Sequence, residues 1–322
     1  MIEVTNLTKK CGDHIAVDHL SFRVEKGQIY GFLGPNGAGK STTMNIITGY
    51  LAATEGTVTI DGKDIQKDPE AAKRAIGYLP ELPPLYVDMT VREYLDFVAE
   101  LKKVPKKERK QQIDEVMEMT QITDMQQRLI RNLSKGYRQR VGLAQAILGY
   151  PEVIILDEPT VGLDPKQIIE IRDLIRKLGE NHTVILSSHI LSEVSAVCDH
   201  IMIIAHGKLV ASDSPENLQK LMSGSMELDL EVKGSIAAVK SALQEISQID
   251  RIEENTEASK NIAKLKVISK ENADIREQVF YALADAKLPI LEMTHAEKSL
   301  EDIFLELTEV VAPTQSRKYI MF

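Results

Sequence analysis

A glycine-rich stretch between an apolar run and a helical segment constrains the fold of this chain more than any other feature. It matches the pattern G-x-x-x-x-G-K-[ST] and reads Gly34-Pro35-Asn36-Gly37-Ala38-Gly39-Lys40-Ser41-Thr42. Residues 28–33 before it are typical of a buried strand, and residues 39–48 after it are typical of a helix. Glycines let such a turn wrap so that successive backbone N–H groups point at phosphate oxygens. The sequence therefore predicts a phosphate-binding loop.

Two side chains of this loop carry chemistry of their own. We expect Lys40 to reach the β- and γ-phosphates of a nucleotide and the Ser41 hydroxyl to ligate Mg²⁺. The start of the following helix adds a dipole that favours an anion. An ordinary glycine-rich turn is the alternative, and the strand–helix context argues against it.

A second buried run, residues 153–157, ends in Asp157 and is followed by Glu158. Parallel strands end at the same sheet edge as the phosphate loop, so we expect both carboxylates to lie near it. Asp157 is then placed to hold Mg²⁺ and Glu158 to polarise an attacking water. A solvated acidic pair at a strand end is the alternative.

A third apolar run, residues 183–187, leads to His189. This position predicts a histidine on the γ-phosphate side of the same site, with a purely structural role as the alternative.

The alternation of strand and helix patterns over residues 1–222 predicts an α/β domain around a largely parallel, mixed sheet. The expected strands are 2–5, 22–24, 28–33, 57–60, 76–79, 153–157 and 183–187, and the expected helices are 39–48, 90–102, 107–119, 138–148 and 165–178. The two helices between 90 and 120 interrupt the rhythm and indicate an inserted helical subdomain at about 82–150.

The character of the chain changes after this region. Ser223-Gly224-Ser225 is typical of a linker. Residues 223–310 then follow a βαββαβ order, which predicts a small α+β, ferredoxin-like domain that ends in an amphipathic segment at 299–308. Residues 311–322 are expected to be a tail.

Composition excludes several classes of protein. The net charge of −9 argues against a nucleic-acid partner. The chain has only two cysteines, Cys11 and Cys198, which fits a reducing, cytoplasmic compartment. We expect no signal peptide, because the N-terminus has no apolar stretch after a basic start. We expect no membrane span either, because no apolar run reaches the roughly 20 residues that a span needs. A membrane role would require another chain that crosses the bilayer.

Further motifs make the resemblance to a known family specific. The segment Leu133-Ser134-Lys135-Gly136-Tyr137-Arg138-Gln139 resembles the signature of the ABC ATPases, and it precedes a helix ahead of the acidic strand. Val161-Gly162-Leu163-Asp164 resembles the D-loop of the family, and His189 resembles its switch histidine. The resemblance covers residues 1–222 and implies a P-loop NTPase cassette.

The resemblance also implies a mechanism and partners. Two cassettes pack head to tail, and each ATP lies between the phosphate loop of one and the signature of the other. Ser134 and Gly136 would serve the partner's γ-phosphate, and Asp164 would belong to the same nucleotide site. The chain would be the ATP-hydrolysing subunit of a transporter, working as a homodimer through ATP-driven dimerisation. A separate transmembrane permease would hold it at the cytoplasmic face of the cell membrane.

Two positions depart from the family pattern. Cys11 stands where the family usually has an aromatic residue that stacks on adenine, so we expect weaker base contact, supplied in part by Val17. Glu81 stands where the family usually has a glutamine that ligates Mg²⁺, and a carboxylate can serve as that ligand. Glu81 also makes the chain resemble the branch that exports drugs and sodium and supports gliding motility.

Two other functions remain open at this point. One is an ABC ATPase outside transport, although the chain has one cassette and no heptad arm. The other is a regulatory cassette that hydrolyses ATP weakly because of Cys11 and Glu81. The sequence does not identify the cargo, and it favours export over import only through the family branch. We expect the C-terminal domain to be a packing and dimer-stabilising extension, with ligand sensing as the alternative.

Overall fold

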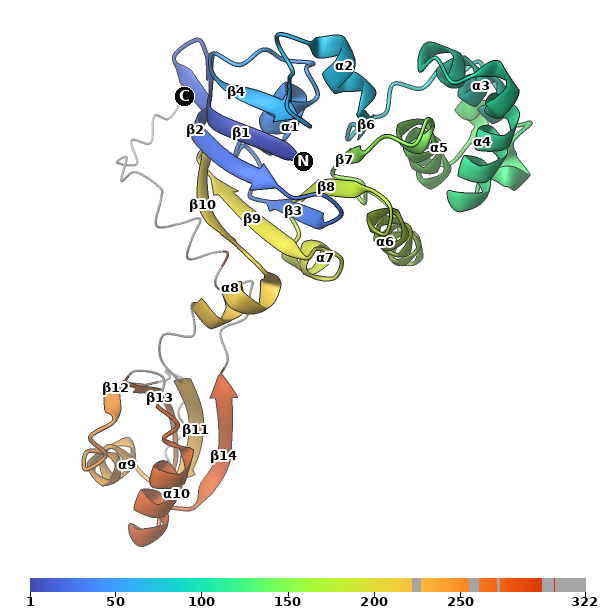
Figure 1. Ribbon diagram of the computed structural model, residues 1–322. Helices are drawn as coiled ribbons and strands as arrows, with labels where there is room; N and C mark the ends of the chain where they lie inside the picture. Colours follow the sequence, from blue (N-terminus) through green and yellow to red (C-terminus); the bar gives the residue numbers. More distant parts are fainter. Residues whose placement is uncertain (222–226, 255–260, 271–272, 297–303, 305–322) are drawn as a thin grey trace, which may run out of the picture. The chain divides into compact units, whose positions relative to one another are not determined.

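The computed structural model describes residues 1–221, 227–254, 261–270, 273–296 and 304 (Figure 1). They fall into two compact units, Met1–Pro215 and a second that begins at Glu216, while Phe304 groups with the first. Each unit has a hydrophobic core of its own.

A six-stranded sheet forms the centre of the first unit. Its order is β10-β9-β3-β8-β7-β6, and its strands run parallel except β10, which is antiparallel to β9. The strands are β3 (Ile29–Leu33), β6 (Ile76–Leu79), β7 (Val153–Asp157), β8 (Thr183–Ser188), β9 (His200–Ala205) and β10 (Lys208–Asp213). Every residue of β3, β7 and β8 is buried, as expected of parallel strands covered on both faces. The predicted mixed sheet is thus confirmed.

An antiparallel sheet of order β2-β1-β4-β5 lies in the same unit. Its strands are β1 (Ile2–Cys11), β2 (His14–Val24), β4 (Glu55–Ile60) and β5 (Lys63–Asp64). β1 and β2 are much longer than the sequence predicted. Register shifts between them, and the left-handed backbone of Asn6 and His19, interrupt the alternation of buried and exposed residues by which strands are recognised.

Helices cover the sheets and form a separate group of three. They are α1 (Lys40–Ile47), α2 (Pro69–Arg74), α3 (Val91–Leu101), α4 (Lys106–Met119), α5 (Lys135–Ile147), α6 (Pro165–Gly179) and α7 (Leu191–Ser195), with short 3-10 turns at Thr123–Met125 and Ile130–Asn132. A further helix, α8 (Pro215–Leu221), begins at the last residue of this unit and otherwise belongs to the second. α3 packs against α4 and α5 away from the antiparallel sheet (Figure 1). This group corresponds to the predicted helical insertion.

The start of α3 shows why the sequence folds this way locally. Thr90 and Glu93 form a capping box in which the Glu93 N–H donates to Thr90 Oγ1 and the Thr90 N–H donates to Glu93 Oε2. The predicted apolar face of the helix is buried, and it consists of Val91, Tyr94, Leu95 and Val98.

The second unit is the predicted small α+β domain. It consists of β11 (Glu227–Lys233), α9 (Ile236–Leu243), β12 (Ile249–Glu254), β13 (Ile262–Ser269), α10 (Arg276–Asp285) and β14 (Ile290–Ala296). The antiparallel order β12-β13-β11-β14 is that of a ferredoxin-like sheet. The predicted segment 299–308, apart from Phe304, and the tail 311–322 lie outside the described residues. Among the described residues, no helix has both the length and the apolar character that a membrane span requires.

Candidate active site

The glycine-rich stretch forms the loop between β3 and α1. Gly39, at the N-cap of α1, has φ 103°, and a Cβ there would lie 2.5 Å from the backbone oxygen of Ala16. Only glycine fits this conformation and this close approach. Gly39 offers no capping side chain, so the first N–H groups of α1 remain available for an anionic ligand.

This loop lines a cavity of about 470 Å³. The lining residues are His14, Ala16, Asn36, Gly37, Ala38, Gly39, Lys40, Ser41, Thr42, Glu81, Glu158, Val161 and His189. Gly34 and Pro35, the first two residues of the loop, do not line the cavity; their carbonyl oxygens accept hydrogen bonds from Lys40 Nζ at 2.7 and 3.3 Å. The structure thus places residues 36–42 of the loop, Glu81, Glu158 and His189 around one space.

Asp157 lies beside the loop at the end of β7, with 3% of its surface exposed. Its Oδ1 accepts hydrogen bonds from Ser41 Oγ at 3.3 Å and from the Ser187 hydroxyl. A hydroxyl and a carboxylate oxygen therefore meet at the edge of the cavity, and both are ligands that Mg²⁺ prefers. Asp157 itself is not among the lining residues, whereas Glu81, which is exposed, places a carboxylate in the lining.

This donor set fits a metal ion that arrives with its substrate. Among the residues that the structure describes, no group of three or more histidine, cysteine, aspartate or glutamate side chains could hold a metal. Mg²⁺ commonly takes one or two protein carboxylates and completes its shell with phosphate oxygens and water. Ser41, Asp157 and Glu81 meet that requirement.

Glu158 lies between two other site residues. Its Oε1 is 3.5 Å from Lys40 Nζ, and its Oε2 is 2.9 Å from His189 Nδ1. The side chain is buried, and the backbone is left-handed at φ 48°, which is costly for a residue with a Cβ. Hydrogen bonds from its N–H to Ser187 hold it in place.

A buried network that the sequence did not predict supports His189. Glu193 Oε2 accepts hydrogen bonds from Thr160 Oγ1 at 2.5 Å and from Ser188 Oγ at 3.1 Å. The Ser188 hydroxyl in turn accepts from the N–H of Ile190. The turn that carries His189 is therefore tied to the segment after Glu158. Threonine and glutamate carry no spacing signal for such a pairing, so the sequence alone could not reveal it.

The two residues expected beside adenine do not line the cavity. Val17 is completely buried in the core of the first unit, and Cys11 is exposed at the end of β1. His14 and Ala16, which the sequence analysis missed, line the cavity from the start of β2. The expectation for Val17 is therefore corrected, because its side chain packs inward, away from the cavity that Ala16 lines.

The signature lies elsewhere on the first unit. Ser134 is the N-cap of α5 and accepts a hydrogen bond from the Tyr137 N–H, and Asp164 caps α6 in the same way through the Gln167 N–H. A Cβ on Gly136 would lie 2.5 Å from Gln167 Oε1, so the signature packs directly on α6. Ser134, Gly136 and Asp164 do not line the cavity.

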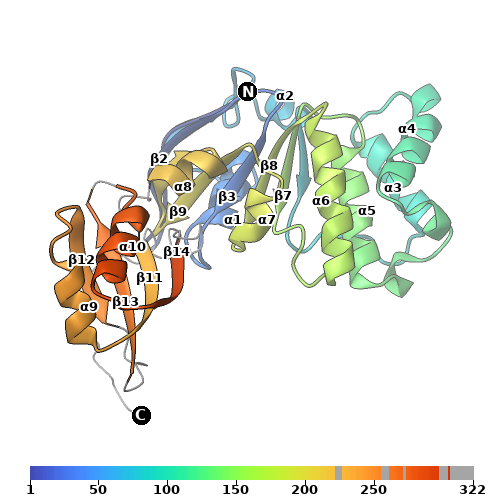
Figure 2. The ribbon, with the colours of Figure 1, turned by 90° about the horizontal axis from the view of Figure 1, so that it is seen from below.

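Arg140 fixes α5 between its neighbours. Its buried guanidinium donates to the Thr120 backbone oxygen at the end of α4 and pairs with Glu170 on α6. Figure 2 shows α5 and α6 side by side. The first half of α5, which carries the signature, is therefore packed against both α4 and α6.

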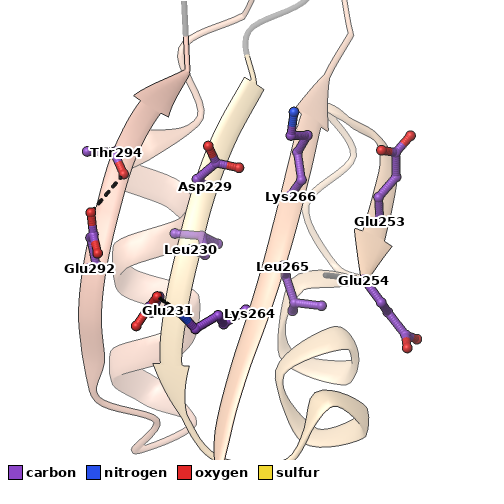
Figure 3. A pocket seen from close by; sticks show the side chains of 10 residues that line it. All are labelled: Asp229, Leu230, Glu231, Glu253, Glu254, Lys264, Leu265, Lys266, Glu292 and Thr294. Carbon is purple, nitrogen blue, oxygen red and sulfur yellow. Dashed lines mark hydrogen bonds and ion pairs between the residues drawn. The ribbon is translucent and has the colours of Figure 1, made fainter. Parts of the chain in front are cut away.

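The second unit has a hollow of about 520 Å³ on the outer face of its sheet (Figure 3). Its lysines are neutralised across strands, Lys264 by Glu231 and Lys266 by Glu227, the latter at 3.0 Å. Glu292 accepts a hydrogen bond from the Thr294 hydroxyl. The lining side chains form neither a nucleophile–base pair nor a phosphate cradle, so this face is that of a solvated sheet.

Comparison with known proteins is consistent with this geometry. The profile of the ABC transporter family matches residues 17–161. The bacitracin transport ATP-binding protein BcrA of Bacillus licheniformis is 36% identical over 309 residues, which span 95% of this chain and 97% of BcrA. The linearmycin resistance ATP-binding protein LnrL of Bacillus subtilis is 32% identical over 313 residues, which span 96% and 98%.

Solved structures share the fold of the first unit. The dimeric bacterial ABC transporter cassette MJ0796 has a TM-score of 0.61 and 27% identity, over 66% of this chain and 98% of that one. The cbiO1 protein of Clostridium perfringens, part of the transporter complex cbiONQ, has a TM-score of 0.62 and 28% identity, over 67% and 89%.

Proposed function

This chain belongs to the ATP-binding proteins of the ABC transporter family, and we propose that it powers export through a separate membrane permease by closing on a second cassette when ATP binds. It is an ABC ATPase cassette. The proposal rests on the separation of the nucleotide cavity from the signature. The phosphate loop, Glu158 and His189 surround one cavity, while the signature lies on another surface of the same unit.

Phosphate binding falls to the loop 34–42. The backbone N–H groups of the loop and of the first turn of α1 hold the phosphate oxygens. Lys40 now donates to Gly34 and Pro35 and lies 3.5 Å from Glu158. We propose that the Lys40 ammonium group pairs with the β- and γ-phosphates when ATP binds, so that it no longer pairs with Glu158 Oε1.

Ser41, Asp157 and Glu81 would hold Mg²⁺ beside the phosphates. The 3.3 Å hydrogen bond between Ser41 and Asp157 marks where their oxygens converge. When bound, Mg²⁺ would neutralise charge on the β- and γ-phosphate oxygens.

Glu158 is the residue that we assign to the attacking water. Its freed oxygen accepts a hydrogen bond from the water, whose oxygen adds to the γ-phosphorus as the bond to ADP breaks. His189 keeps Glu158 aligned through the 2.9 Å contact, and the buried Glu193 network keeps His189 in place. The left-handed backbone of Glu158 turns the carboxylate into the cavity.

Ser134, Gly136 and Asp164 would complete the site of a partner. They do not line the cavity of their own chain, so we propose that the N-terminus of α5 contacts the nucleotide that is bound to a second cassette. The dimeric structure of MJ0796 supports this arrangement, and one kind of cassette per chain favours a homodimer.

Export and attachment to a permease are supported by the relatives. BcrA is named for bacitracin transport, LnrL for linearmycin resistance, and cbiO1 is part of a transporter complex. We propose that the chain lies at the cytoplasmic face of the membrane and docks through the loop after β6 and through α3. Leu82, 77% exposed, and Tyr86 and Val87 offer apolar contacts there. The C-terminal unit is proposed as a packing and dimer-stabilising extension.

The test is ATP turnover by the full-length chain, measured beside Glu158→Gln with size-exclusion runs in ATP. We expect wild-type turnover to rise more than linearly with protein concentration. Glu158→Gln should lose at least about 100-fold in turnover and elute as a dimer in ATP, because it closes without hydrolysing. Glu152→Gln is the matched control, since Glu152 is an exposed carboxylate before β7 that pairs with Lys26; it should behave as wild type.

Turnover that is linear in protein concentration, together with a monomeric Glu158→Gln chain in ATP, would contradict the two-cassette mechanism. Turnover that survives Glu158→Gln would remove Glu158 from its role. The permease is tested by purifying the tagged full-length chain from detergent-solubilised membranes, since a cassette that carries no membrane-spanning protein with it would overturn the docking proposal.

A further inference from the structure

Glu193 is a buried carboxylate that joins two segments of the first unit. It lies in α7 with 5% of its surface exposed, and no lysine or arginine of the described residues forms an ion pair with it. A buried carboxylate without a cation is costly unless hydrogen bonds stabilise its charge. Its Oε2 accepts two such bonds, from the Thr160 hydroxyl at 2.5 Å and from the Ser188 hydroxyl at 3.1 Å. One carboxylate oxygen therefore joins the segment after β7 to the end of β8.

The second of these bonds reaches the turn that carries His189. The Ser188 hydroxyl also accepts a hydrogen bond from the Ile190 N–H at 3.0 Å, and the Glu193 N–H donates to the Ile190 backbone oxygen at 3.2 Å. Both residues that flank His189 are thus bound to Glu193. The ring of His189 lies 2.9 Å, through Nδ1, from Glu158 Oε2.

The first bond reaches the segment that leads from Glu158 to Asp164. The Val161 N–H donates to the Glu158 backbone oxygen and the Leu163 N–H to the Thr160 backbone oxygen, both at 3.2 Å. The segment therefore consists of two overlapping turns. Thr160 is buried within it, whereas Asp164 at its end is exposed. A partner that contacts Asp164 contacts the same short segment that donates to the buried carboxylate.

We infer that Glu193 makes the position of His189 depend on the second cassette, because its carboxylate joins the segment of Asp164 to the turn of His189. This inference rests on the proposed two-cassette mechanism and adds a means by which docking regulates hydrolysis. Docking at Asp164 fixes the Thr160 hydroxyl on the carboxylate, and the carboxylate fixes the turn that aligns His189 with Glu158. Neither Thr160 nor Glu193 lines the nucleotide cavity, so both are positioning residues.

The test removes the Thr160 hydroxyl and keeps the shape of the side chain. ATP turnover of the full-length chain is measured against ATP and against protein concentration. The gain in turnover per chain on dimerisation should be about tenfold smaller in Thr160→Val than in wild type, with KM for ATP unchanged. Thr160→Val in the Glu158→Gln background should still elute as a dimer in ATP. Thr160→Ser retains the hydroxyl and should show the wild-type gain.

Ser188→Ala tests the other bond to the carboxylate. It should lower kcat as Thr160→Val does, and the double variant should lose no more than the more severe single variant, because both hydroxyls act through Glu193. Thr120→Val is the matched control for stability. Thr120 is completely buried and its hydroxyl donates to the Val116 backbone oxygen, outside the site, so its kcat should match wild type.

An equal gain on dimerisation in wild type and Thr160→Val would overturn the inference, and so would losses that multiply in the double variant. A dimer that is lost in Thr160→Val, or a loss of kcat in Thr120→Val of the same size, would reduce the network to a structural role. Failure of the two-cassette mechanism looks different, because wild type itself would then show turnover linear in protein concentration.

Discussion

At the scale of single residues, Glu158 shows how the site depends on an unfavourable backbone. Its left-handed φ of 48° follows a fully buried strand, and two hydrogen bonds from its N–H to Ser187 stabilise it. Strain of this kind persists only where surrounding contacts fix it, and it occurs often at functional sites. Its result is a carboxylate held between Lys40 and His189.

Glu81 leads to a prediction about metal dependence. If it supplies a metal oxygen, Glu81→Ala should raise the Mg²⁺ concentration for half-maximal ATP turnover by roughly tenfold while leaving turnover at saturating Mg²⁺ less affected. The measurement is turnover against free Mg²⁺ at fixed ATP. Glu81→Gln should recover most of the affinity, because its amide oxygen can also ligate Mg²⁺.

Asp88→Ala is the control for this experiment. Asp88 belongs to the same loop region but pairs with Arg131 and does not line the cavity. An Mg²⁺ dependence that is identical in wild type and Glu81→Ala would remove Glu81 from the metal site.

At the scale of elements, the N-terminus of α5 combines a structural and a functional task. Ser134 caps the helix, and the same hydroxyl and the same helix end are assigned to the nucleotide of the partner. Asp164 has the matching position on α6, and Gly136 packs against Gln167 between the two helices. We therefore expect a substitution at Ser134 to change both stability and turnover, and the two effects need to be separated.

A pair of cap substitutions separates them. Ser134→Ala should lower the free energy of unfolding by about 1 kcal/mol and lower ATP turnover by about 100-fold. Asp68→Ala removes the side-chain cap of α2 and should cost similar stability, because Asp68 accepts a hydrogen bond from the Ala71 N–H in the same way. Its turnover should match wild type.

Denaturant unfolding and turnover are measured on both variants. If Ser134→Ala loses no more turnover than Asp68→Ala, the hydroxyl is only a helix cap and the assignment to the partner's nucleotide is wrong.

At the scale of the whole molecule, the chain has two separate cores. Phe32, Met44 and Ile155 belong to the core of the first unit, whereas Leu228, Leu265 and Val267 belong to that of the second. Because each core is made within its own unit, we expect each unit to unfold as a unit of its own.

Leu265→Ala tests this independence. Leu265 is 2% exposed in the second core, so the substitution should cost that unit about 2–5 kcal/mol. Calorimetry should show one thermal transition moving down while the transition that ATP stabilises stays in place, and turnover should stay near wild type. Ile155→Ala, in the first core, should move the ATP-stabilised transition instead. A joint shift of both transitions in Leu265→Ala would mean that the two units unfold cooperatively.

The amino-acid sequence by itself determined the parts that rest on local patterns. The phosphate loop, the buried strands β7 and β8, the apolar face of α3 and the order of the second unit are each encoded within a short window, by periodicity and by turn and cap residues. Asp157, Glu158 and His189 could be assigned to one place because parallel strands end at one edge of a sheet.

Only the tertiary structure decided the rest. The Thr160–Glu193 hydrogen bond, the packing of Gly136 on Gln167 and the approach of Ala16 to Gly39 join segments that carry no shared pattern. Ala16 and His14 line the cavity where Val17 was predicted to do so, and this difference also depends on contacts between segments that share no sequence pattern. Side chains alternate along a strand, so a shift of one residue moves a side chain from the core to the cavity. The register shifts of the β1–β2 hairpin, set by contacts across the sheet, fix which residue faces which side.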